Sequence, residues 1–172
     1  AEVPAERWDV NAYTDDDPNA PGKMIARWGG FLDGIDKFDP QFFGISPREA
    51  AQMDPQQRLL LELTWEALES GGIRPSAIRG SRCGVLVGFS GSDYGYRGAE
   101  DLSAVNAFSM TGITGSIAAN RISYAFDLRG PSMAVDTACS SSLVAFHQAC
   151  QSIHSGDADI AVTGAVSLNL HP

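Results

Sequence analysis

The sequence has few cysteines and no long apolar run. Only three of its 172 residues are cysteine, and their positions (83, 139 and 150) lack the close pairing of disulfide scaffolds and zinc sites. No stretch of about 18 apolar residues is present, and no charged N-terminal segment is followed by an apolar one. These absences argue against a secreted scaffold, a metal site, membrane insertion and export. They predict a cytoplasmic protein.

Positive charge is also scarce. Twelve Lys and Arg residues stand against 21 Asp and Glu residues, and the formal net charge of -9 disfavours nucleic acid as a partner. A glycine-rich turn, Ser90 to Gly95, follows an apolar segment. Neither GxGxxG nor GxxxxGK followed by Ser or Thr is present, so we reject a nucleotide-binding function for this turn. The sequence therefore predicts no directly bound cofactor.

Helical and strand patterns alternate after an irregular start. The first 45 residues are rich in Gly, Pro, Asp and Asn and predict loop. Ser46 and Asp54 are each followed by proline, as in a capped helix with proline at its first position. The second of these helices is expected to end at Gly71. Its apolar face is expected to consist of Leu59, Leu60, Leu63, Ala67 and Leu68.

The remaining elements predict an α/β fold. A helix is expected at 115–125, and short buried strands are expected at 83–89, 132–135 and 160–166. The last two strands flank a helix at 140–155 and so form a βαβ unit, in which both strands are parallel.

Cys139 stands where a strand is expected to end and a helix to begin. A thiol at the N-terminal end of a helix meets the positive end of the helix dipole and unpaired backbone N–H groups, which favour the thiolate. The N–H of Cys139 itself is suited to form half of an oxyanion hole. The carboxyl end of a strand is also where open α/β sheets place their sites. The alternative is a packed structural cysteine, because free cysteines are among the most buried residues. Local sequence leaves both open.

Longer segments carry a resemblance to a known family. The stretch DTACSSS, which contains Cys139, is preceded by GPSMAV and followed by LVAFHQACQSI. Further segments in the same order are VPAERWDV, GGFLDGIDKFDPQFFGISPREAAQMDPQQRLLLELTWEALESGG, CGVLVGFSGSDY and GSIAANRISYAFDLRG. Together they resemble the β-ketoacyl synthase (ketosynthase) domains of modular type I polyketide synthases over nearly the whole chain.

The resemblance implies a fold and a place within it. It implies the thiolase-like fold, layered α/β/α/β/α in the intact domain. Residues 1–172 are expected to be a partial ketosynthase domain, mainly its N-terminal half and truncated at both ends. The family's two catalytic histidines and the second oxyanion donor are then expected beyond Pro172.

The resemblance also implies a reaction and partners. Cys139 is expected to accept an acyl chain from the phosphopantetheine of an acyl carrier protein, and decarboxylative Claisen condensation with a malonyl-type unit then extends the chain. The expected partners are that carrier protein, the acyltransferase and other domains of the same synthase, and a second copy that pairs through about Ser132 to Thr137. Two alternatives stay open: a fatty-acid β-ketoacyl synthase, and a non-catalytic fragment limited to acyl binding or dimerisation.

The other histidines and cysteines are not expected to act with Cys139. His147 and His154 lie roughly 12 and 22 Å further along the same helix, at about 1.5 Å per residue. They and His171 are expected to be surface or packing residues. Cys150 and Cys83 are expected in the core. Docking of an acidic carrier protein would need local positive charge. The candidates, each of which also reads as plain surface charge, are Arg7, Arg27, Arg48, Arg58, Arg74, Arg79 and Arg82.

Overall fold

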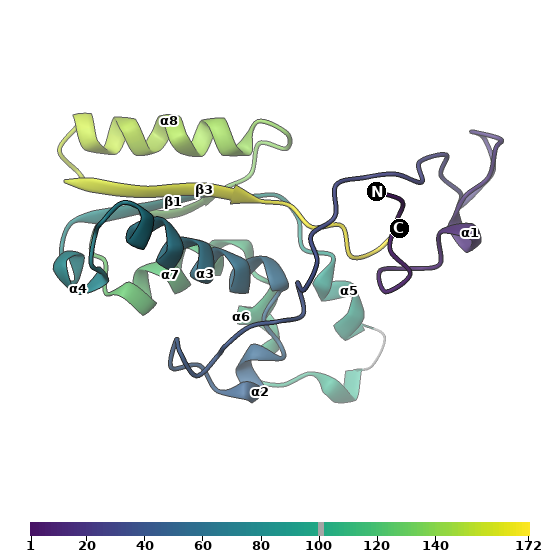
Figure 1. Cartoon of the computed structure of the whole chain (residues 1–172), viewed down its shortest axis with the longest axis horizontal. Coiled ribbons are helices and arrows are strands. Elements are labelled where there is room, and N and C mark those ends of the chain that lie inside the picture. The colour runs from purple at the N-terminus through teal and green to yellow at the C-terminus, as the bar shows by residue number, and fades with distance from the viewer. Residues whose placement is uncertain (100–101) are drawn as a thin grey trace. The chain divides into compact units, whose positions relative to one another are not determined.

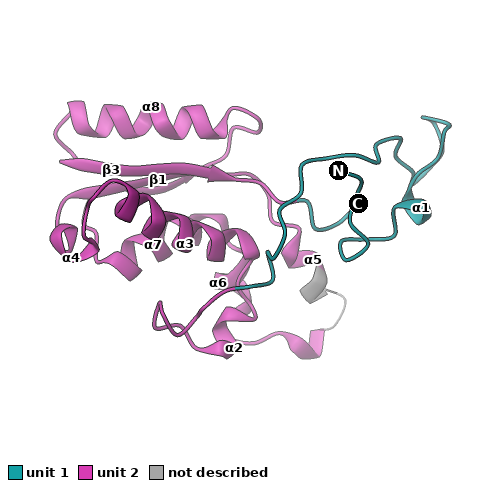
Figure 2. Cartoon of the chain, viewed as in Figure 1, with its two compact units in different colours: residues 1–37, 169–172 teal, residues 38–168 magenta. Residues whose placement is uncertain are grey.

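The computed structural model describes residues 1–99 and 102–172, and these form two compact units (Figure 2). Unit 1 consists of Ala1–Lys37 together with Asn169–Pro172, and unit 2 of Phe38–Leu168. The short helix α1 (Val10–Tyr13) is the regular element of unit 1. Most of this unit is irregular, as the composition predicts. Arg27 stabilises it by donating hydrogen bonds to Glu2 Oε1 at 3.0 Å and to Thr14 Oγ1 at 2.9 Å.

Unit 2 is built on a three-stranded parallel sheet in the order β2-β1-β3. The strands are β1 (Cys83–Phe89), β2 (Ser132–Val135) and β3 (Ile160–Val166). All three strands are confirmed where the sequence predicts them, and the two strands of the βαβ unit are parallel. They are not neighbours, however, because β1 lies between them. The expectation that all three are buried is wrong for β2 and β3, which are only half-buried because they lie at the two edges.

Helices cover both faces of the sheet, which gives three layers (Figure 1). Helix α8 (Ser141–His154) lies on one face, and α3 (Pro55–Ser70) and α7 (Gly115–Phe126) lie on the other. The remaining helical segments are α2 (Pro47–Ala50), α4 (Pro75–Ile78), α5 (Tyr94–Ala99), η1 (Leu102–Ala104) and α6 (Ser109–Ile113). No helix in the described ranges has the length and apolar character needed to cross a membrane.

The helix ends follow the capping rules that the sequence indicates. Ser46 Oγ accepts a hydrogen bond from the Glu49 N–H at 3.2 Å at the start of α2. Asp54 Oδ1 accepts one from the Gln56 N–H at 2.7 Å at the start of α3. Helix α7 ends at Phe126, and its C-cap residue Asp127 has a left-handed conformation (φ 52°). Local chemistry therefore fixes where these helices begin and end.

The predicted apolar face of α3 is partly wrong. The helix buries Leu60, Leu61, Thr64 and Leu68 against the core, whereas Leu63 is 49% exposed and Ala67 is exposed as well. Helix α3 packs against both α7 and the sheet, so its buried stripe runs through Leu61 and Thr64 rather than through Leu63. A polar Thr64 is accommodated because its hydroxyl donates to the Leu60 carbonyl at 2.6 Å.

Helix α8 has a small inner face and an apolar outer face. Ala145 and Ala149 are buried, while Leu143 is 74% and Phe146 is 56% exposed. Small inner side chains let the helix approach the sheet closely. The large apolar side chains therefore point away from the sheet.

Candidate functional site

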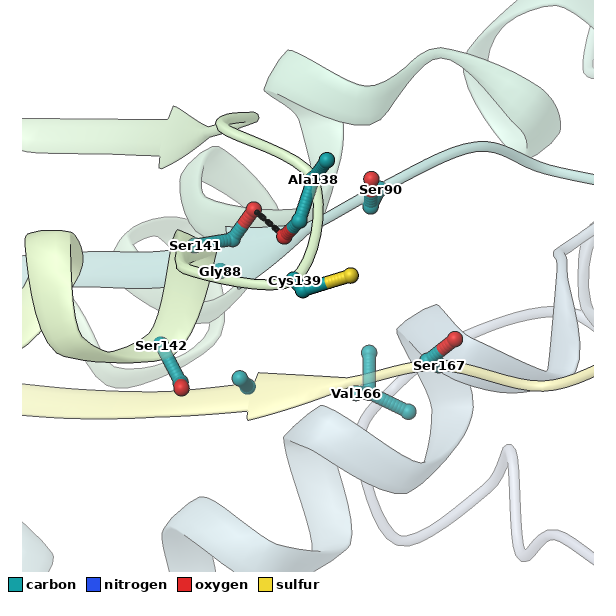
Figure 3. Close-up of a pocket in the computed structure, with 9 residues that line it drawn as sticks. Gly88, Ser90, Ala138, Cys139, Ser141, Ser142, Val166 and Ser167 are labelled. Atoms are coloured by element: carbon teal, nitrogen blue, oxygen red, sulfur yellow. Dashed lines mark hydrogen bonds between the residues drawn. The ribbon is translucent and has the colours of Figure 1, made fainter.

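The carboxyl ends of the three strands meet around Cys139. A cavity of about 400 Å³ opens there. It is lined by Gly88, Ser90, Ala138, Cys139, Ser141, Ser142, Ala165, Val166 and Ser167. Figure 3 shows the Cys139 sulfur directed into the space that Ser90, Val166 and Ser167 border. The segments that follow β1, β2 and β3 each contribute to this cavity.

The start of α8 sits directly on the backbone of β1. A Cβ atom built on Gly88 would lie 2.9 Å from both the Ser141 carbonyl carbon and the Ser142 nitrogen. It would also lie 3.0 Å from the Cβ of Ala165, the partner of Gly88 on β3. Contacts this short are not tolerated between real atoms, so the site requires glycine at position 88. This close approach brings the N-terminus of α8 to the edge of the cavity.

A tight turn joins β2 to α8 and presents Cys139. Ala138 has a left-handed backbone (φ 52°), which is uncommon for a residue with a Cβ atom. Its N–H donates to Asp136 Oδ1 at 3.0 Å, and its carbonyl accepts from Ser141 Oγ at 2.6 Å. Ser141 Oγ in turn accepts from the Thr137 N–H at 2.9 Å. The turn is therefore held by side chains at both of its ends.

Asp136 also links this turn to β1. Ser90, which directly follows β1, donates its hydroxyl to Asp136 Oδ1 at 2.7 Å. This bond, together with the one from the Ala138 N–H, lowers the pKa of the Asp136 carboxyl group. The carboxylate thus stays ionised at neutral pH and keeps both bonds.

Cys139 itself is exposed, and neither its thiol nor its backbone N–H makes a hydrogen bond with a described residue. The side chain is therefore not a packed structural cysteine, the alternative that local sequence left open. Cys83 is buried as predicted, and burial raises the pKa of its thiol. Cys150 is only half-buried, so its assignment to the core is confirmed only in part.

The histidines on α8 do not join the site. His147 and His154 are both exposed, so they are surface residues rather than packing residues, the two roles expected for them. His171 lies in unit 1 and is also exposed. Among residues 1–99 and 102–172, no three His, Cys, Asp or Glu side chains are grouped closely enough to hold a metal ion.

The arginine candidates for docking differ in their burial and in the hydrogen bonds and ion pairs of their side chains. Arg58 is wrong as a docking residue, because it is buried and donates to the Met53 carbonyl at 2.6 and 2.9 Å. Arg27 pairs with Glu2, Arg82 pairs with Asp159, and Arg7 donates to backbone carbonyls. Among the candidates, the exposed arginines whose side chains make no hydrogen bond or ion pair to a described residue are Arg48, Arg74 and Arg79.

Sequence reasoning missed most of the cavity around Cys139. Gly88 lies in β1, Ser90 directly follows β1, and Ala165 lies in β3, all far from Cys139 in the sequence. The rule that sites form at the carboxyl ends of parallel strands pointed to these positions. Applying it required the strand order, which places β1 beside both β2 and β3.

Comparisons with known proteins agree over the full length of the chain. The family model "Beta-ketoacyl synthase, N-terminal domain" matches residues 1–172. A phenolphthiocerol/phthiocerol polyketide synthase subunit of Mycobacterium tuberculosis is 51% identical over 99% of this chain, which covers 9% of that protein. A polyketide synthase of Streptomyces halstedii is 49% identical over 99% of this chain, which covers 2% of that protein.

Solved structures give the same result. The oxazolomycin ketosynthase domain of Streptomyces albus matches with a TM-score of 0.92 and 44% identity, over 100% of this chain and 30% of that one. The ketosynthase from module 6 of the bacillaene synthase of Bacillus subtilis matches with a TM-score of 0.83 and 38% identity, over 100% of this chain and 28% of that one. The predicted thiolase-like α/β fold is thereby confirmed.

Proposed function

Because the chain belongs to the β-ketoacyl synthase family of polyketide synthases, we propose that Cys139 is the nucleophile that receives the acyl chain during polyketide elongation. One observation carries this proposal. Cys139 is exposed, lies at the N-terminal end of α8, and faces a cavity at the carboxyl ends of three parallel strands. Helix N-termini favour thiolates and bind anionic groups, and both properties serve attack on a thioester.

The first half-reaction is acyl transfer to the protein. The Cys139 thiolate attacks the carbonyl carbon of an acyl thioester carried on the phosphopantetheine of an acyl carrier protein. Negative charge develops on the carbonyl oxygen, and the Cys139 N–H donates a hydrogen bond to it. The bond from this carbon to the carrier sulfur then breaks, and the carrier sulfur leaves as a thiolate that takes up a proton. The acyl group is now held as a thioester on Cys139.

The second half-reaction forms the new carbon–carbon bond. A malonyl-type unit on a carrier protein loses carbon dioxide, and the electron pair of the broken bond becomes a carbanion. The carbanion attacks the acyl-cysteine carbonyl, which releases the Cys139 thiolate and leaves a β-ketoacyl chain, two carbons longer, on the carrier protein. The chain spans about a third or less of the ketosynthases and synthases it matches. We expect the histidines of this step in the part of a ketosynthase domain that this chain does not cover.

Two surfaces support the wider assembly that this function needs. The outer face of α8 exposes Leu143, Phe146 and Ile153, as expected if a second half of the domain packs there. Strand β2 is at the edge of the sheet, as expected for a strand that pairs with a second copy.

Exposed Arg48, Arg74 and Arg79 are available to an acidic carrier protein. The cytoplasmic location stays a prediction.

The test of acyl transfer uses the intact mass of the chain. After incubation with a short acyl thioester, we expect a single acyl adduct, complete loss of it in Cys139→Ala, and retention of it in the matched control Cys150→Ala. Folding of each sample is verified by circular dichroism. An adduct that survives in Cys139→Ala, or a folded chain without any adduct, contradicts acyl loading of Cys139 in this chain.

A graft tests the complete reaction. Residues 1–172 replace the matching part of the oxazolomycin ketosynthase domain, which is 44% identical. We expect condensation with a malonyl-type thioester in the graft, and none in its Cys139→Ala version or in the chain alone. A folded graft that is acylated but does not condense leaves the non-catalytic alternative, in which the chain only binds acyl groups.

A further inference from the structure

The direction of the Cys139 N–H is set by the peptide that joins it to Ala138. A trans peptide holds its C=O and N–H groups antiparallel, and no peptide bond among the described residues is cis. Whatever fixes the Ala138 carbonyl therefore also fixes the Cys139 N–H. That carbonyl accepts two hydrogen bonds from Ser141, from Oγ at 2.6 Å and from the backbone N–H at 3.0 Å. Figure 3 shows the first of these bonds.

The other side of Ala138 is held by Asp136. The Ala138 N–H donates to Asp136 Oδ1 at 3.0 Å, and the left-handed backbone of Ala138 needs such support because its Cβ disfavours this conformation. The same oxygen accepts from the Ser90 hydroxyl at 2.7 Å. The turn is thereby tied to the end of β1, the central strand.

Ser141 is more deeply buried than the serines on either side of it. It is only 5% exposed, whereas Ser140 and Ser142 are both exposed. Its hydroxyl uses both of its functions, as a donor to the Ala138 carbonyl and as an acceptor from the Thr137 N–H. A buried hydroxyl with donor and acceptor both satisfied holds one orientation.

We propose that Asp136 and Ser141 are positioning residues for acyl transfer, which hold Ala138 from its two sides and so aim the Cys139 N–H at the thioester oxygen. This inference rests on the proposed function. Neither side chain is expected to touch the reacting atoms, since both act through Ala138. Asp136 acts through its two accepted hydrogen bonds and not through its charge.

The test compares two reactions of the same sulfur. Acylation by a thioester develops an oxyanion that the Cys139 N–H must meet, whereas alkylation by iodoacetamide develops none. Both rates are measured by intact mass on the 172-residue chain and on the graft. In Asp136→Ala and in Ser141→Ala we expect the ratio of acylation to alkylation to fall at least about tenfold. A role confined to folding lowers both rates together and leaves the ratio unchanged.

Two matched variants sharpen this test. The Ser140 hydroxyl donates to the Thr137 carbonyl at 2.8 Å and lies 2.9 Å from Thr137 Oγ1, and it does not bond to Ala138. In Ser140→Ala the ratio is expected to stay within about twofold of the parent. Asp136→Asn keeps an oxygen that accepts both hydrogen bonds, so its ratio is expected to stay within about threefold.

Every result of these measurements bears on either the inference or the proposed function. An unchanged ratio in folded Asp136→Ala and Ser141→Ala overturns the inference, and so does a ratio in Asp136→Asn as low as in Asp136→Ala. A parent protein that is alkylated but never acylated defeats the proposed function instead. If Asp136→Ala or Ser141→Ala fails to fold, Ser90→Ala takes its place, since it removes only the outer bond to Asp136. Its expected ratio is about threefold lower, and an unchanged ratio counts against the inference.

Discussion

The two ends of the parallel sheet in unit 2 each carry a cysteine, and the two thiols have opposite environments. Cys83 begins β1 at the amino end, is fully buried with Val85 and Val87, and has a raised pKa because of that burial. Cys139 follows β2 at the carboxyl end and is exposed at the start of α8. At the amino end, core side chains bury the Cys83 thiol. At the carboxyl end, a hydrogen-bonded turn presents Cys139 to solvent. We therefore expect the two thiols to differ in reactivity.

Polar groups differ between the ends in the same way. At the amino end, Arg82 pairs with Asp159 on the surface, and more than half of each side chain is exposed, so the pair adds little to stability. At the carboxyl end, Ser90 and Asp136 bond to each other and to the turn around Cys139. The hydrogen-bonded Ser90 and Asp136 thus hold the turn that carries Cys139, whereas the exposed Arg82–Asp159 pair lies at the other end of the strands.

The largest expected contrast is in thiol alkylation. In the folded chain we expect iodoacetamide to modify Cys83 more than about 100-fold more slowly than Cys139, because the buried thiol reacts only when the core opens. Peptide mapping by mass spectrometry measures each rate. In denaturant the two rates should become similar, which serves as the control. Equal rates in the folded chain would contradict the difference between the two ends.

Glycine substitutions along β1 give the next largest contrast. Gly88→Ala places a Cβ atom 2.9 Å from the backbone of α8. We expect it to lower the free energy of unfolding by about 1–3 kcal/mol and to slow acylation of Cys139, since the start of the helix must move.

Gly84 is the matched control at the amino end of the same strand and on the same face. A Cβ atom there would have its nearest neighbour, Leu86 Cδ1, at 3.4 Å, an ordinary contact. Gly84→Ala is expected to be neutral or to stabilise by up to about 1 kcal/mol. Urea unfolding measures both variants. A neutral Gly88→Ala would show that α8 can withdraw from β1 without cost.

Local patterns predicted the elements of the fold but not their mutual contacts. The caps at Ser46 and Asp54 and the position of Cys139 at a helix start depend on residues a few positions apart, so the sequence encodes them directly. The buried face of α3 depends on its contacts with α7 and the sheet, and there the prediction placed Leu63 wrongly.

The same distinction explains the candidate site. Cys139 was predicted because strand, turn and helix follow one another in the chain. Gly88, Ser90 and Ala165 were not, because the periodicity of a strand does not say which strand lies beside it. Once β1 is known to lie between β2 and β3, the carboxyl-end rule brings these residues together.

The smallest expected contrast is in the pH dependence of stability. Hydrogen bonds from Ser90 and Ala138 lower the pKa of Asp136 in the folded state. The stability that ionised Asp136 contributes is therefore present above its unfolded-state pKa of about 3.9, and it is lost as the pH falls through the lower folded-state pKa. Burial raises the pKa of Cys83 in the folded state. The stability that the neutral Cys83 thiol contributes is therefore present below its unfolded-state pKa of about 8.5, and it is lost as the pH rises above that pKa. Urea unfolding over a pH series should therefore show an acid loss that Asp136→Asn lacks and an alkaline loss that Cys83→Ala lacks. If Asp136→Asn keeps the full acid loss, another carboxylate causes it, and the hydrogen bonds from Ser90 and Ala138 do not favour the ionised form of Asp136 in the folded state.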